Sequence, residues 1–294
     1  LITTKRGQQG ETQIRVNYES GYRSDIGRLE LMNSQEWIEY HIEAQGETET
    51  RSDVEDFGYP EDFDPADIPT FDWQDFIYRD GMTQNLNVSV SGGTEQTQFY
   101  ISAGYEDTEA QIKEVEFKRY NLRTNFDHQF TPNFRSGLSI NLTNTSSPGV
   151  CQDGFFVNCP FYQSIEEVPM SFPYVDADGN LTGRNTLDEG GSYNPNTEQG
   201  LNNNPAVILN EEVRETDITS ILANLTPTYN ILPWLSLRSL IGIDYRLEKE
   251  RDWERPIADP GNDGSVNRRF ATSSNITANL RLNAQQTFGE SHNV

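Results

Sequence analysis

The sequence predicts an all-β fold: the wall of a transmembrane, antiparallel, up-and-down β-barrel with long loops at one end. Three observations predict it. Polar and apolar residues alternate along extended segments, short and long connections alternate between those segments, and no apolar run reaches the length of a transmembrane helix. Only 34% of the 294 residues are hydrophobic. A barrel wall tolerates this composition because only every second strand residue meets lipid.

The clearest alternation lies at residues 86–128. In its last segment Leu122 and Phe126 fall on one face, while Arg123 and Asn125 fall on the other. A long strand with one apolar and one strongly polar face is typical of a barrel with lipid outside and water inside. The same alternation predicts eight strands, at 11–22, 84–92, 97–106, 118–130, 133–146, 216–231, 234–250 and 271–288.

The connections between these strands alternate in length. Short turns are expected near Gly93, Pro132, Pro233 and Gly289. Long connections are expected at 23–83, 107–117, 147–215 and 251–270. Short periplasmic turns and large extracellular loops would produce this order, whereas a soluble β-sandwich would not sort its loops by length.

Aromatic residues cluster near both ends of the predicted strands. Those near the short turns are Phe99, Phe130, Phe134, Tyr229, Trp234 and Phe288, and those near the long loops are Tyr22, Tyr105, Tyr120 and Tyr245. They predict two aromatic girdles at the membrane interfaces. The alternative is ordinary enrichment of aromatic residues in strands.

The first long connection contains the one short loop helix that the sequence predicts, at residues 33–44, with Asn33 and Glu36 in a capping-box pattern. Residues 41–80 carry thirteen Asp or Glu against two Arg, a net −11 of the total −24. We interpret this as a solvated acidic loop. Ca²⁺ binding there is chemically reasonable, but no ordered ligand spacing supports it, so no metal or cofactor is predicted.

The second long connection contains the candidate binding residues. Cys151 and Cys159 are the only cysteines, and we expect them to form a disulfide on the cell exterior. The candidate ligand-binding residues are Phe155, Phe156, Tyr162, Tyr174 and Tyr193. Such rings can stack on sugars or clamp a peptide, but they can equally form the core of the loop itself.

Two classes of function are disfavoured. The acidity argues against a nucleic-acid partner, because phosphate binding needs clustered Lys and Arg.

The segment Asp176-Ala-Asp-Gly-Asn180 superficially resembles a calcium-binding loop. Its Gly is fourth and not sixth, so the segment instead predicts a turn. No nucleophile elbow, P-loop or His-Glu-x-x-His pattern occurs, so no enzyme is predicted.

Several motifs resemble those of SusC/RagA-type TonB-dependent transporters. Leu1-Ile-Thr-Thr-Lys-Arg-Gly7 resembles the closing strand of their plug domain, and Leu31-Met-Asn-Ser-Gln-Glu-Trp37 resembles their first-loop helix motif. Asp72-Trp-Gln-Asp-Phe-Ile-Tyr-Arg79 resembles the segment before their second strand, and residues 89–105 and 117–128 resemble their second to fourth strands. These motifs cover the first half of the chain, and the second half matches by pattern only.

The resemblance implies a multi-pass importer in the outer membrane of Bacteroidota. In that family a 22-stranded barrel holds a plug, a SusD-like surface lipoprotein covers the extracellular mouth, TonB supplies energy, and oligosaccharides or peptides are taken up. It assigns residues 1–10 to the end of the plug and 11–294 to the first part of the barrel, about eight of the 22 strands. We therefore expect the sequence to be a piece of a larger protein.

Two alternatives stay open: a non-transporting outer-membrane barrel that acts as an adhesin or anchor, and a soluble carbohydrate-binding β protein. The substrate is the least constrained feature. Loop 147–215 combines aromatic rings and amides with few basic residues, so a polyanionic ligand would meet like charge. We expect a neutral or cationic oligomer, with a glycan favoured over a peptide.

Overall fold

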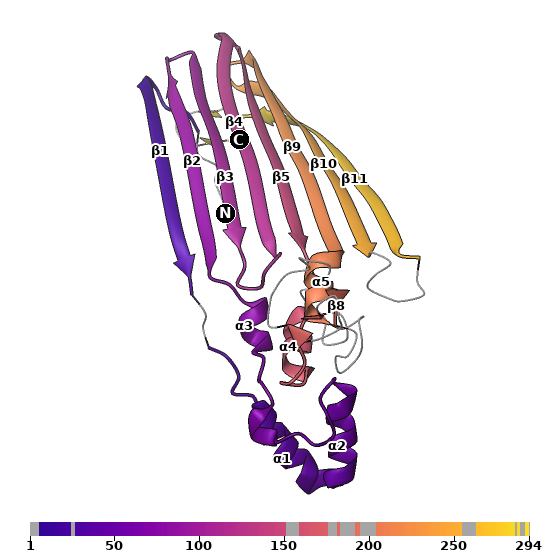
Figure 1. Ribbon diagram of the computed structural model, residues 1–294. Coiled ribbons are helices and arrows are strands. Elements are labelled where there is room, and N and C mark those ends of the chain that lie inside the picture. Colours follow the sequence, from indigo (N-terminus) through magenta and orange to yellow (C-terminus); the bar gives the residue numbers. More distant parts are fainter. Residues whose placement is uncertain are drawn as a thin grey trace.

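In the computed structural model, residues 6–24, 27–150, 159–175, 181–182, 192–194, 204–254, 263–285, 287–288 and 292–293 are described. Eight long strands form one antiparallel sheet in the order β1-β2-β3-β4-β5-β9-β10-β11. They are β1 (Gly10–Arg23), β2 (Gly81–Gly93), β3 (Thr97–Glu109), β4 (Glu116–Thr131), β5 (Phe134–Gly149), β9 (Glu212–Leu232), β10 (Leu235–Glu254) and β11 (Ser265–Ala284). Each long strand pairs with the next one along the chain, so the predicted up-and-down wall is confirmed (Figure 1).

All eight predicted strands are present, and their ends differ by a few residues. The largest difference is at the last strand, which begins at Ser265 rather than at residue 271 and ends at Ala284 rather than at residue 288. The following residues form a separate ladder of β12 (Thr287–Phe288) and β13 (His292–Asn293). The predicted turn near Gly289 lies outside the described residues.

The register aligns apolar residues across the whole sheet. One row crosses all eight strands and contains Ile14, Val90, Ile101, Thr124, Ile140, Ala223, Ile243 and Ile276. The adjacent row contains Arg15, Ser89, Ser102, Arg123, Asn141, Leu222, Asp244 and Asn275. Because successive side chains point to opposite faces, these two rows belong to opposite faces: the first is apolar apart from Thr124, and the second is polar apart from Leu222.

The apolar face is the exposed one. On the central strand β4, Leu122 is 42% and Phe126 is 38% exposed, whereas Asn125 on the polar face is 4% exposed. A protein surrounded by water on all sides would bury such a face against a second layer. A wall with lipid outside has this arrangement, which argues against the soluble alternative.

Aromatic rings gather near both ends of the wall. At the end with the short turns, Phe130 stacks on Phe134 with ring centroids 5.3 Å apart, and Tyr229 follows at 6.5 Å. At the other end, Tyr105 and Tyr120 lie 5.0 Å apart. These contacts fit the two predicted girdles.

Helices gather at the long-loop end of the wall (Figure 1). They are α1 (Ser34–Gln45), α2 (Glu47–Asp56), the 3-10 helix η1 (Pro65–Asp67), α3 (Trp73–Ile77), α4 (Pro160–Glu166) and α5 (Pro205–Glu211). The expectation of a single loop helix is wrong, although α1 and its capping box at Asn33 and Glu36 are confirmed. The helices α3, α4 and α5 span only five to seven residues, too short to show a helical period in the sequence. In the described part of the chain, no helix has the length and apolar character needed to cross a membrane.

These helices belong to a unit that we call the cap, made of Val150 and the described residues within 27–80, 110–115, 159–175, 192–194 and 204–211. The cap has two apolar cores. One contains Trp73, Phe76, Ile77, Val150, Tyr174, Tyr193, Ala206, Val207, Ile208 and Leu209, and it lies next to the wall. The other contains Ile38, Val54, Phe63, Ile68, Val168 and Met170. Residues from the first and third connections meet in both cores, so these two loops fold as one body.

The second connection, at residues 107–117, also contacts the cap. Tyr78 forms an isolated β-bridge with Ile112, and the Arg79 amide donates to the Gln111 carbonyl at 2.7 Å. The Lys113 ammonium donates to the Phe76 carbonyl, and partial burial of this amine lowers its pKa. The hairpin between β3 and β4 therefore locks α3 onto the end of the wall.

Candidate functional site: a hollow in the cap and the polar face of the wall

A hollow of about 460 Å³ opens in the cap between the segment before α1, the segment before α3, and α4 with the residues after it. Its lining is part apolar and part polar. The lining residues are Leu29, Leu31, Met32, Asn33, Trp37, Thr70, Phe71, Asp72, Trp73, Gln74, Ser164, Ile165, Glu166, Glu167 and Pro169. A volume of this size is typical of a small-ligand site.

One wall of the hollow is an extended segment that side chains hold in place. The buried Gln74 side chain accepts a hydrogen bond from the Leu29 amide at 3.0 Å and donates one to the Leu29 carbonyl at 2.8 Å. Arg28 lies 3.5 Å from Asp72 and 3.0 Å from Asp75. The backbone is therefore fixed by polar contacts and not by burial of its apolar side chains.

The floor of the hollow is rigid. Trp73 is 3% exposed, and its indole N–H donates to the Val168 carbonyl at 3.3 Å and to the Ser171 hydroxyl at 3.2 Å. The Phe71 ring meets the Trp73 ring edge to face, with centroids 4.9 Å apart. These contacts join the segment before α3 to the residues after α4 and set the depth of the hollow.

The charged groups in the lining are all acidic. They are Asp72, Glu166 and Glu167, and the lining contains no Lys, Arg or His. Glu167 is 5% exposed and accepts a hydrogen bond from the Ser171 hydroxyl at 3.3 Å. The side chain of Tyr162 bonds to Glu166, and this hydrogen bond raises the pKa of the phenol.

The structure separates the five predicted ligand-binding residues. Tyr162 does not line the hollow, but its side chain is hydrogen-bonded to Glu166, which does. Tyr174 and Tyr193 are each 3% exposed in the cap core. The Tyr193 hydroxyl donates to Glu211 at 2.7 Å, and burial together with this bond raises its pKa. Both tyrosines thus support the alternative in which these rings form the core of the loop.

The other predictions for this loop fall partly outside the described residues. Phe155 and Phe156 lie outside them, so their ligand role stays a prediction. Cys159, at the N-terminus of α4, is 4% exposed and disulfide-bonded. Its predicted partner Cys151 lies outside the described residues, and the pairing stays a prediction. Within the described ranges, no group of three or more His, Cys, Asp or Glu is placed to hold a metal ion.

The sequence did not predict this hollow as a binding site, although the motifs at 31–37 and 72–79 that resemble the transporter family contribute to its lining. Leu29, Leu31 and Met32 show neither a strand nor a helix period, and Gln74 is one amide among many. A usable signal was the cluster of apolar residues directly before the Asn33 cap, in a loop that is otherwise strongly acidic.

The polar face of the wall carries a second hollow, of about 470 Å³, at the short-turn end. Arg6, just before β1, crosses this face and forms an ion pair with Asp127 at 3.1 Å. Gly7 passes so close to β3 that a Cβ there would lie 2.4 Å from the Phe99 amide nitrogen. The segment before β1 is therefore seated directly on the polar face.

The two ends of the polar face differ in how their arginines are neutralised. Near the long loops, Arg119, Arg246 and Arg269 pair with glutamates of the same wall at 2.6, 2.9 and 3.4 Å. Near the short turns, Arg135, Arg238 and Arg281 share one register row that also includes Thr228. Within the described residues, this row has no ion pair. It is thus available to carboxylates from another segment or from a bound molecule.

The chain is similar in sequence to curated TonB-dependent receptors. It is 23% identical to TonB-dependent receptor P39 of Formosa agariphila over 100% of this chain and 26% of the relative. It is 24% identical to TonB-dependent receptor SusC of Bacteroides thetaiotaomicron over 83% of this chain and 24% of the relative. No protein-family model matches the chain. The chain spans about a quarter of the length of these relatives.

Solved structures agree on the fold. The RagAB peptide importer in the closed-closed state matches with a TM-score of 0.70 at 16% identity, over 99% of this chain and 34% of the other. The open-open state of that importer gives a TM-score of 0.69 at 17% identity, with the same coverage. The relatives are receptors and importers by name, not enzymes. The chain is therefore similar in sequence to a segment of TonB-dependent receptors, SusC among them, and in fold to a segment of the RagAB importer over 99% of its length.

Proposed function

We propose that the chain is part of a TonB-dependent importer in a bacterial outer membrane that takes up oligosaccharides or peptides. The observation that carries this proposal is that the apolar face of the wall is exposed and the polar face is covered: Leu122 on the apolar face is 42% exposed, and Asn125 on the polar face is 4% exposed. Lipid outside and a polar interior account for both values. The match to transporters over the whole chain supports the same function.

Residues 1–10 would form the end of a plug domain, and 11–294 the first strands of the barrel. The ion pair of Arg6 with Asp127 supports this division, because it draws the segment before β1 onto the polar face. A SusD-like lipoprotein would cover the cap side, and TonB would act from the periplasm on a region upstream of this segment. Neither a cofactor nor a nucleic-acid partner is part of the proposal.

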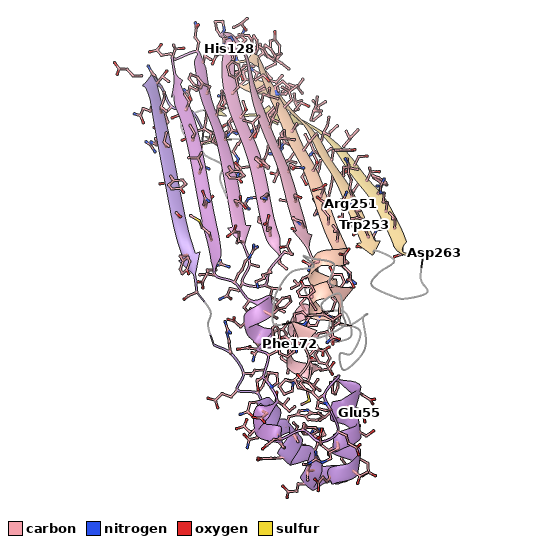
Figure 2. The ribbon with its side chains drawn as sticks, viewed as in Figure 1. Glu55, His128, Phe172, Arg251, Trp253 and Asp263 are labelled. Atoms are coloured by element: carbon pink, nitrogen blue, oxygen red, sulfur yellow. The ribbon has the colours of Figure 1, made fainter. Side chains whose placement is uncertain are left out.

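The orientation follows from the loops. The cap would lie outside the cell and the short turns would face the periplasm. Glu55 of α2 and His128 of β4 lie at opposite ends of the molecule (Figure 2). A cysteine replacing Glu55 should therefore react with an impermeant maleimide on whole cells, and one replacing Thr94 in the β2–β3 turn should not. Labelling of the Thr94 position alone would reverse the orientation.

Uptake by the full-length protein tests the function itself. Cells that express it would be given fluorescent neutral, sulfated and uronic-acid oligosaccharides and short peptides. We expect uptake of a neutral or cationic oligomer that stops when TonB is deleted. Binding without TonB-dependent uptake of any class would support the adhesin or anchor alternative. Selective uptake of a polyanionic glycan would contradict the charge argument.

A further inference from the structure

We propose that the hollow in the cap is a binding site for an extended peptide that bears an apolar side chain next to a basic group. The inference deepens the proposed import function by naming a substrate class, and it rests on that function only in calling the ligand a cargo. It departs from the preference for glycans that the sequence suggested.

The first argument is that the lining of the hollow contains apolar side chains that are exposed and fixed in position. Leu29, Leu31 and Met32 are 54%, 44% and 47% exposed, although the cap has two closed apolar cores that exclude them. Gln74 fixes the Leu29 backbone by two hydrogen bonds, so the segment does not fold these side chains away. A rigid apolar surface that lines a hollow is typical of a binding site, because a ligand meets it without a further ordering cost.

The second argument separates a peptide from a glycan. Stacking on a sugar uses a free aromatic face, and the three rings in the lining are engaged by other rings. Trp73 is 3% exposed, and one face of Trp37 is stacked on His41 with ring centroids 3.5 Å apart. Phe71 packs against Trp73 and Phe172 with centroids 4.9 and 5.3 Å apart. Leu29, Leu31 and Met32 present aliphatic surface, which suits the side chains of Leu, Ile, Val or Met better than it suits the hydroxyls of a sugar.

The third argument is charge. Asp72, Glu166 and Glu167 line the hollow, and residues 41–80 of the same connection carry a net −11. Arg28 pairs with Asp72 at 3.5 Å and neutralises it in part, so the hollow stays net negative through Glu166 and Glu167. This field attracts a cationic ligand and opposes an anionic one, most strongly at low salt. A Lys or Arg beside the apolar side chain of the peptide would place an ammonium or guanidinium group near these carboxylates.

Calorimetry on the purified full-length protein in detergent tests the site without requiring import. The probes are Ac-Arg-Leu-Arg-NH₂, its acidic analogue Ac-Glu-Leu-Glu-NH₂, its polar analogue Ac-Arg-Ser-Arg-NH₂, and maltotriose. We expect the first probe to bind at least about tenfold more tightly than the other three, because each of those lacks the apolar contact, the charge match or both.

Variants connect this binding to the hollow. The double substitution Leu31→Ser with Met32→Ser removes exposed apolar surface, and we expect it to weaken binding of the first probe about tenfold. Glu166→Gln should reduce the preference for the basic over the acidic probe. Tyr40→Ser is the matched control, because Tyr40 is 55% exposed on α1 but does not line the hollow, and it should leave all affinities unchanged.

Three results would overturn the proposal. Tighter binding of maltotriose than of the basic peptide would make the hollow a glycan site. Equal affinity for the basic and acidic probes would remove the charge argument. Loss of a co-purifying lipoprotein from the double variant, with peptide affinity unchanged, would make this surface a protein interface. The two proposals can fail separately. Uptake of glycans without peptide binding would refute only the peptide site. Peptide binding without uptake would refute only the import function.

Discussion

The wall and the cap use the same apolar residue types in opposite ways. Leu122 in the middle of β4 is 42% exposed, whereas Ile77 at the end of α3 is 0% exposed. In the wall the apolar residues alternate with polar ones at period two and point away from the protein. In the cap they occur at irregular spacing and point inward. The difference shows that the medium on each side, lipid or water, decides where an apolar side chain is stable.

The largest expected effect of a single substitution lies in the core of the cap. Ile77→Ala removes a fully buried side chain and should destabilise the cap by about 2–5 kcal/mol through lost burial and a residual cavity. Hydrogen exchange should then accelerate in α3 and α5, with the amides of β4 unchanged. Equal acceleration of exchange in β4 would mean that the cap and the wall unfold as one unit and are not independently stable.

The corresponding change in the wall adds a charge to the lipid face. Leu122→Arg should cost about 2–4 kcal/mol if the residue lies near the bilayer midplane. Asn141→Arg on the polar face is the matched control and should be tolerated better. The sequence suggests Asn125 for this control, but that side chain is 4% exposed and leaves little room for Arg. Heat modifiability on gels measures the folded fraction, and equal tolerance of both variants would contradict a lipid face.

Strand pairing and the inside–outside assignment could be predicted from sequence because the period of two repeats over ten or more residues in each strand. The cap could be predicted only where a strong local signal exists, as with Asn33 and Glu36 of the capping box. The helices α4 and α5 carry only brief start signals, namely Pro160, Pro205 and the Asn204 cap. In α5, Val207 and Ile208 pack in the same core as Ile77 of the first connection. A contact of this kind leaves no local pattern.

The candidate site shows the same limit. Aromatic content could not distinguish rings in a core from rings in a site, and Tyr174 and Tyr193 are buried. Most residues that line the hollow belong to the first connection, between 29 and 74. The hollow depends on Gln74 holding Leu29, a contact 45 residues apart in the chain. The local sequence around Gln74 or Leu29 does not predict this contact.

The disulfide has an intermediate expected effect. If Cys151 and Cys159 are bonded to each other, replacing both with Ser should destabilise this part of the cap by about 2–3 kcal/mol in the chain-entropy model. The wall should be unaffected, because its strands pair without this loop. Mass spectrometry of non-reduced peptides identifies the pairing directly, and a peptide that links either cysteine to a third partner would contradict it.

The smallest expected effect concerns Tyr59, whose hydroxyl donates to the Met170 carbonyl at 2.9 Å between the first and third connections. Burial raises the pKa of this phenol from 10.0 to about 12. Because the folded state holds the proton more tightly than the unfolded state, the contribution of Tyr59 to stability is complete below pH 10. It is lost as the pH rises from about 10 to about 12.

Tyr59→Phe should remove this alkaline dependence and cost about 0.5–1.5 kcal/mol at neutral pH through the lost hydrogen bond. The difference in absorbance at 295 nm between the native protein and this variant isolates one phenol, and we expect its midpoint near pH 12. A midpoint near 10 would place Tyr59 in water, and the packing of α2 against the segment after α4 would then be looser than the cap described above.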